Sequence, residues 1–156
     1  MNDFIELKFP AKADYVGVVR LTASGIASRM GFTYEEIEDV KVAVSEAITN
    51  VVNHAYESQS QGEVTVGFGV YENRLEIMVA DHGESFTLSE VKKDIGPYNN
   101  ELEDIEQLRE GGFGLFLIDA LMDKVQINND YGVIVLMTKY RESNEVGLHD
   151  QISSTK

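Results

Sequence analysis

The 156-residue sequence contains no cysteine and no long apolar run. Without cysteine the chain cannot form disulfides, thiolate metal sites or a cysteine nucleophile, which agrees with a reducing cytoplasm. The longest apolar stretches, such as residues 133–137, are far too short to cross a bilayer. Residues 1–10 mix acidic and basic side chains with apolar ones, unlike a signal peptide. The sequence therefore predicts a cytoplasmic protein without a membrane segment.

Basic residues are also scarce, with 13 Lys and Arg against 27 Asp and Glu, which gives a formal net charge of −14. A field of this sign opposes direct binding to nucleic acid or to an anionic membrane, and it favours a basic protein partner. Solubility alone also explains such a charge.

The overall composition is that of one globular domain, with 43% hydrophobic and 26% charged residues. We expect this domain to span residues 1–141. Residues 142–156 are polar and are expected to form a frayed C-terminal tail.

The N-terminal part of the chain predicts a strand followed by two helices. Residues 4–9 alternate apolar and polar side chains, whereas apolar residues recur at helical spacing over 14–30. Gly31 is placed to end that helix in a left-handed cap. Thr33 and Glu36 then form a capping box, which opens a second helix that continues to about residue 55.

The rest of the chain predicts two hairpins separated by a polar stretch and a short helix. The expected elements are a hairpin of residues 63–71 and 75–81, a polar loop at 84–110, a helix at 113–122, and a hairpin of 125–127 and 133–140. This order predicts an α+β fold, a two-layer sandwich of a mixed, mostly antiparallel sheet with helices on one face. The long loop is typical of a lid over a binding site.

The second helix carries the first group of candidate functional residues. Glu46, Asn50 and Asn53 are spaced to share one face among many apolar neighbours. A carboxylate and two amides beside apolar surface need partners, and a hard cation such as Mg²⁺ accepts oxygen ligands of these types. A solvated stripe on an amphipathic helix is an equally good interpretation of the pattern alone.

Two further motifs lie at predicted element ends. Asp81 ends an apolar strand with Gly83 two residues later, where a carboxylate can accept a hydrogen bond from an exocyclic amine; a simple turn also has this pattern. Gly111, Gly112 and Gly114 lead into an apolar helix, where backbone N–H groups can bind phosphate. A flexible hinge is the competing interpretation.

Other nucleotide-binding motifs are absent. The sequence has no G-x-x-x-x-G-K-[ST] loop, no G-x-G-x-x-G after a strand, and no H-R-D or D-F-G pair. Neither a P-loop enzyme nor a eukaryotic-type protein kinase is therefore expected.

The order and spacing of the three motifs resemble the Bergerat-type ATP site of the GHKL superfamily, which includes DNA gyrase B, bacterial histidine kinases and MutL. The resemblance spans about residues 4–140. Within that superfamily, the segments SEAITNVVNHAY, ADHGESF and EGGFGLFLIDALMDKVQI are similar to the anti-sigma factor serine-protein kinases.

The resemblance implies a role for each candidate residue. Glu46 matches the general base, Asn50 matches the asparagine that holds Mg²⁺, and Asn53 follows on the same helix face. Asp81 matches the aspartate that binds the adenine amino group, with Gly83 beside it. The remaining nucleotide contacts implied are Gly111, Gly112 and Gly114 at the phosphates, with Arg109 next to them.

This sequence departs from the family pattern at two positions. Ser85 replaces the last glycine of Asp-x-Gly-x-Gly, and Val133 replaces a threonine that usually supports the adenine contact. Both changes affect the expected nucleotide affinity more than the expected family.

The resemblance also implies a function and partners. We expect a homodimeric protein that binds ATP or ADP with Mg²⁺, sequesters an alternative sigma factor of the sigma-B type, and phosphorylates a serine of the anti-anti-sigma factor. Two alternatives are an ATP-binding regulatory module without phosphotransfer and a histidine-kinase-like ATPase domain. Label transfer from γ-labelled ATP to an added antagonist protein distinguishes the kinase from the module.

Overall fold

The computed structural model describes residues 2–57, 62–81, 113–128 and 134–141. Its elements follow the predicted order, and their bounds differ from the predicted ones by a few residues at most. The elements are β1 (Asp3–Pro10), the 3-10 turn η1 (Ala13–Tyr15), α1 (Val16–Arg29), α2 (Tyr34–Glu57), β2 (Glu63–Val70), β3 (Arg74–Ala80), α5 (Phe113–Leu121), β4 (Lys124–Asn128) and β5 (Ile134–Tyr140).

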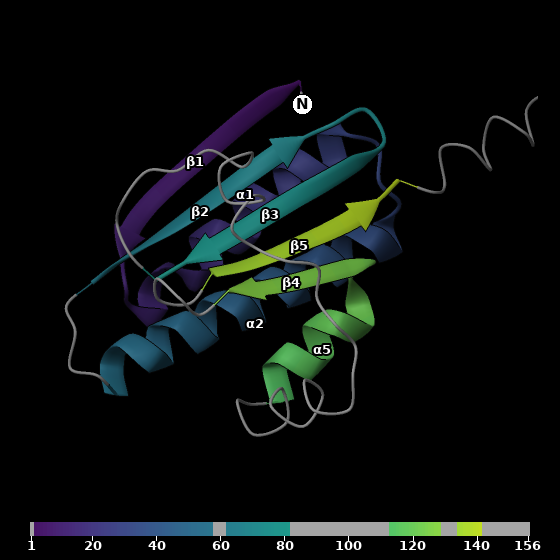
Figure 1. The fold of residues 1–156 in the computed structure, drawn as a ribbon. Coiled ribbons are helices and arrows are strands. Elements are labelled where there is room, and N and C mark those ends of the chain that lie inside the picture. Colours follow the sequence, from purple (N-terminus) through teal and green to yellow (C-terminus); the bar gives the residue numbers. More distant parts are fainter. Residues whose placement is uncertain (1, 58–61, 82–112, 129–133, 142–156) are drawn as a thin grey trace, which may run out of the picture.

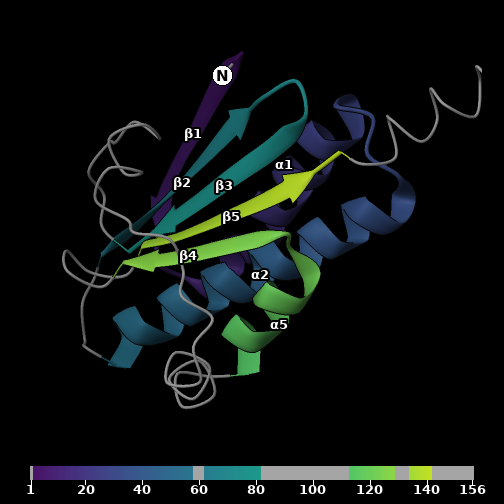
Figure 2. The same ribbon diagram turned by 45° about the vertical axis from the view of Figure 1, so that its right-hand side comes forward.

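The strands form one five-stranded sheet in the order β1-β2-β3-β5-β4. A mostly antiparallel sheet was predicted, and each of the four pairs among the described strands is antiparallel. Helices α1, α2 and α5 all lie on one face of this sheet, as Figures 1 and 2 show from two directions. The predicted α+β two-layer architecture is therefore confirmed.

The main core lies between this face and the helices. Alternate strand residues such as Phe9, Phe68, Ile77 and Met137 point towards the helices and are buried there. From α1, the small residues Val19, Ala23 and Ala27 recur every four positions and are fully buried, which lets the helix approach the sheet closely. A smaller apolar cluster occupies the other face of the sheet: Met78, Ala80, Ile134 and Leu136.

The end of α1 is fixed by a Schellman motif at Gly31. The residue has φ 88°, a left-handed conformation that glycine adopts without steric cost. The Gly31 N–H donates to the carbonyl of Ser28, and the Phe32 N–H donates to that of Ala27. The left-handed cap predicted from the sequence is confirmed, and it turns the chain directly into α2.

The start of α2 has the predicted capping box. The Thr33 N–H donates to Glu36 Oε1 at 2.7 Å, and the Glu36 N–H donates to Thr33 Oγ1 at 3.2 Å. These two bonds satisfy backbone donors that the first turn of a helix leaves without partners.

The polar stretch predicted as a lid, residues 84–110, lies outside the described residues, as does the tail at 142–156. Among the helices that the structure describes, none is both long and apolar enough to span a membrane.

Candidate functional site

The C-terminal half of α2 carries two candidate residues on a partly buried helix face. Glu46 and Asn50 are one helical turn apart and both half-buried. Their neighbours Ala47, Ile48 and Val51 are almost completely buried and fasten this part of the helix to the core. Asn53, on the same face, is exposed. The structure therefore sets Glu46 and Asn50 at the border between core and surface.

Asn50 has a polar atom without a partner. Its Nδ2 is buried and makes no hydrogen bond with any residue that the structure describes. A buried amide group left in this state costs about 1–3 kcal/mol, so most such groups in proteins are paired. Asn50 therefore has hydrogen-bonding capacity that no described residue uses, next to the carboxylate of Glu46.

Asp81 lies directly after the C-terminal end of β3 and is half-buried. In both views of the fold, this end of β3 and the C-terminal half of α2 lie towards the same end of the molecule (Figures 1 and 2). Helix α2 also contacts β3 directly. The fold therefore places the Glu46–Asn50 pair and the carboxylate of Asp81, which are about thirty residues apart in sequence, towards the same end of the molecule.

The third motif is only partly described. Gly114 is the second residue of α5, and α5 packs against α2. The first turn of α5, where backbone N–H groups and the positive end of the helix dipole lie, therefore belongs to a helix that packs against α2. Helix α2 is the one that carries Glu46 and Asn50. The other predicted residues of this site fall outside the described residues: Gly83, Arg109, Gly111 and Gly112.

A buried lysine that the sequence analysis did not single out anchors the other end of α5. Lys139 Nζ donates to the carbonyl oxygen of Leu121, the last residue of α5, at 2.7 Å, and lies 3.3 Å from Asp39 Oδ2 on α2. Lys139 is 9% exposed. The alternation of β5 could have indicated it, because Lys139 follows Val135 and Met137 on the helix-facing side of the strand.

The donor set fits a nucleotide with a hard cation. Among the described residues there is no group of three or more His, Asp or Glu side chains that could hold a metal ion alone. Mg²⁺ in phosphate-binding sites, however, commonly takes one or two protein ligands and completes its shell with phosphate oxygens and water. Because a half-turn of an amide exchanges Oδ1 and Nδ2, the unpartnered position of Asn50 can present an oxygen to such an ion.

Comparison with known proteins identifies the family of this chain. Residues 9–139 match the family model of the histidine kinase-like ATPase domain. The chain is 63% identical to the serine-protein kinase RsbW of Oceanobacillus iheyensis over 155 residues, covering 99% of this chain and 98% of the relative. It is 54% identical to the protein of that name from Bacillus subtilis, covering 95% and 91%, and 54% identical to that of Bacillus velezensis, covering 92% and 89%. The chain belongs to the RsbW family of serine-protein kinases, and its fold is the ATP-binding histidine kinase-like domain.

Proposed function

We propose that this protein is an anti-sigma factor with kinase activity, which transfers the γ-phosphoryl group of ATP to a serine of an anti-anti-sigma factor. In the same proposal it sequesters an alternative sigma factor of the sigma-B type. The observation that carries the catalytic part is the half-buried pair on α2, in which Glu46 lies one turn from an Asn50 amide whose Nδ2 has no partner among the described residues.

Glu46 is the proposed general base. In the transfer step, the serine hydroxyl oxygen forms a bond to the γ-phosphorus while the bond to the bridging oxygen of the β-phosphate breaks. The hydroxyl proton passes to the Glu46 carboxylate, and ADP leaves. Phosphoryl transfer depends mainly on positioning and on charge neutralisation, so one well-placed carboxylate is enough side-chain chemistry for this role.

The remaining residues have proposed binding roles. Asn50 would hold Mg²⁺, which when bound neutralises phosphate charge, and Asn53 would lie close to the phosphates. Asp81 would accept a hydrogen bond from the adenine amino group beside Gly83. The proposed phosphate contacts are the N–H groups of Gly111, Gly112 and Gly114, together with the Arg109 side chain.

The test of the catalytic proposal is a Glu46→Gln variant, which keeps the shape of the side chain but removes the proton acceptor. We expect phosphate transfer from γ-labelled ATP to a purified antagonist protein to fall by about 10²–10⁴-fold, the range for loss of a general base. ATP binding should change little. Thr49→Ala, on an exposed neighbouring position of the same helix, is the matched control and should retain activity.

Glu46→Gln with unchanged transfer would exclude this residue as the base. No transfer by the unaltered protein, despite ATP binding, would instead indicate a regulatory module without kinase chemistry.

The proposal also includes the switch between partners. ATP would favour retention of the sigma factor, whereas ADP would allow the antagonist to displace it, and the protein would act as a cytoplasmic homodimer. Light scattering over a range of concentrations tests the dimer. Competition binding of the two partners in ATP and in ADP tests the switch, and an identical preference in both nucleotides would contradict it.

A further inference from the structure

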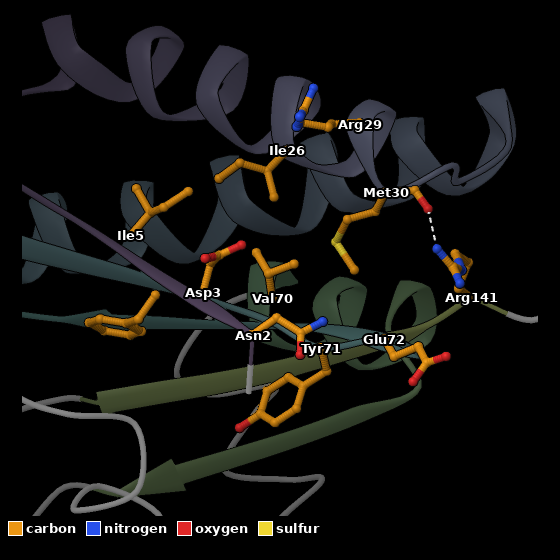
Figure 3. Close-up of a pocket in the computed structure, with 11 residues that line it drawn as sticks. Asn2, Asp3, Ile5, Ile26, Arg29, Met30, Val70, Tyr71, Glu72 and Arg141 are labelled. Carbon is orange, nitrogen blue, oxygen red and sulfur yellow. Dashed lines mark hydrogen bonds between the residues drawn. The ribbon is translucent and has the colours of Figure 1, made fainter.

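Two cations at the C-terminal end of β5 hold the ends of two helices. Lys139 Nζ donates to the carbonyl oxygen of Leu121, the last residue of α5, at 2.7 Å. Arg141, which follows β5, donates from Nη1 to the carbonyl oxygen of Met30 at the end of α1, at 2.6 Å (Figure 3). Each cation therefore lies at the negative end of a helix dipole, where a positive charge is favourable.

Lys139 also connects α5 with a second helix. Its Nζ lies 3.3 Å from Asp39 Oδ2, in the N-terminal half of α2. Replacing an almost buried ion pair by apolar side chains is often neutral or stabilising, so stability is a weak explanation for a lysine at this position. A charged group with two fixed partners does, however, select one arrangement of the helices that carry those partners.

Apolar burial fixes α5 at few points. The helix is nine residues long, and of its side chains that the structure describes, residues 116–121, Ile118 is the one that is completely buried. Phe116 and Leu117 are 43% and 37% exposed. The carbonyl group of Leu121 is therefore a second fixed point, and two points are needed to define the direction of a helix.

We propose that Lys139 is a positioning residue for nucleotide binding, because it sets the direction of α5 relative to α2. This inference rests on the proposed function, in which the N–H group of Gly114 contacts a phosphate. Gly114 and Leu121 are about 10 Å apart along the helix axis. If the C-terminal end is released, α5 can pivot at Ile118 and carry its first turn out of alignment with the phosphates. Lys139 itself touches neither the nucleotide nor the reacting atoms.

The first test measures the direction of α5 without any nucleotide. Residual dipolar couplings of backbone amides are recorded on the isotope-labelled full-length protein and on Lys139→Met, which keeps an apolar stem of similar length. We expect the couplings of α5 to depart from the parental orientation, whereas those of α2 and of the sheet remain. A lysine that only stabilised the fold would leave the direction of α5 unchanged.

The second test measures Mg-ATP affinity by calorimetry, at a temperature at which circular dichroism shows each variant to be folded. Lys139→Met should bind Mg-ATP roughly tenfold more weakly or worse, since one misaligned hydrogen bond to a charged group costs about this much. Asp39→Asn leaves the bond to Leu121 in place. It should bind within about threefold of the parent protein, because a partly exposed ion pair contributes little.

Two controls separate position from stability. Arg141→Met removes the matching bond at the end of α1, a helix that carries none of the residues assigned to ATP, and should leave Mg-ATP affinity unaltered. Val19→Ala opens a cavity beneath α1 and lowers stability without touching Lys139, so it should also bind normally.

Unchanged couplings of α5 in Lys139→Met would overturn the proposal. So would unchanged Mg-ATP affinity despite a reoriented α5, or an equal loss of affinity in Val19→Ala. A parent protein that does not bind Mg-ATP would overturn the proposed function together with the role of Lys139. Loss of phosphate transfer alone, with Mg-ATP binding intact, would concern Glu46 and not Lys139.

Discussion

Asn50 is expected to affect two quantities that can be measured separately. One is the free energy of unfolding of the nucleotide-free protein, and the other is the affinity for Mg-ATP. The buried Nδ2 of Asn50 has no partner among the described residues, so Asn50→Ala removes an unsatisfied group and a poor helix former together with some packing. We expect the free energy of unfolding of the nucleotide-free variant to stay within about 1 kcal/mol of the parent protein. A tenfold loss of Mg-ATP affinity would remove about 1.4 kcal/mol of ligand-induced stabilisation.

Thermal melts with and without Mg-ATP check both parts of this prediction. The exposed Thr49→Ala change should leave both melts unaltered. A large loss of stability in the free variant, with the ATP-induced shift intact, would mean that Asn50 is structural.

The ion pair of Arg74 and Glu76 allows a second prediction about single residues, which concerns the stability of the protein. Both residues lie in β3, towards the end of the strand opposite to Asp81. Arg74 Nε donates to Glu76 Oε2 at 2.8 Å, and its guanidinium lies 3.7 Å from the centre of the Tyr71 ring. Burial of Arg74 lowers its pKa, but the hydrogen bond and charge of Glu76 outweigh this effect, so the pKa is raised overall. The arginine is therefore charged at neutral pH.

Because Glu76 is only 3% exposed, Arg74→Ala removes the cation beside a buried carboxylate. We expect the free energy of unfolding, measured in urea, to fall by about 1.5–3 kcal/mol. The double change Arg74→Leu with Glu76→Leu removes both charges and should cost less than Arg74→Ala alone. A double variant that is as unstable as the sum of its single changes would show that the pair is not coupled.

At the scale of elements, the capping box gives a prediction of known size. Thr33→Ala removes the side-chain acceptor for the Glu36 N–H and should lower the free energy of unfolding by about 1 kcal/mol. Thr33→Ser keeps the hydroxyl and should restore most of it. Urea denaturation of the two variants provides the comparison, and equal stabilities would show that the hydroxyl is not needed for α2.

The anchor of α5 predicts an effect on a helix that packs against α2. Lys139→Met keeps a long apolar stem in β5 but loses the bonds to Leu121 and Asp39. We expect amide hydrogen exchange in α5 to become faster, by about tenfold or more, because the last carbonyl of the helix loses its donor. Asp39→Asn removes only the ionic contact and should have a smaller effect. Unchanged exchange in Lys139→Met would show that α5 is held by packing alone.

The sequence predicted elements better than contacts, for physical reasons. The capping box at Thr33 and the helix end at Gly31 each depend on a few neighbouring residues, so the sequence alone could predict them. Both make the expected hydrogen bonds in the structure. The spacing of Glu46 and Asn50 placed both on one helix face, since helical geometry alone decides this. The Lys139 anchor and the bond from Arg141 to the end of α1 join residues from distant parts of the chain, and no local pattern encodes such contacts.

At the scale of the whole molecule, the net charge of −14 predicts how a basic partner would associate. Attraction at long range raises the association rate and is screened by salt, whereas short-range contacts control dissociation. We expect the association rate constant with the proposed sigma factor to fall about tenfold between roughly 50 and 500 mM salt, with a much smaller change in dissociation. Stopped-flow fluorescence measures both rates. An association rate that does not depend on salt would leave the charge as a matter of solubility.

The position of β5 has a consequence for the synthesis of this protein. It is the last described strand in sequence, but in the sheet it lies between β3 and β4. While residues 134–140 are still inside the ribosome, the backbone groups along one edge of β3 have no neighbouring strand. The nascent chain can form its first three strands early, yet the strand that precedes Asp81 gains its second neighbour only after residues 134–140 have left the ribosome. An unfinished chain should therefore be unable to bind ATP, and it would need protection from aggregation during that interval.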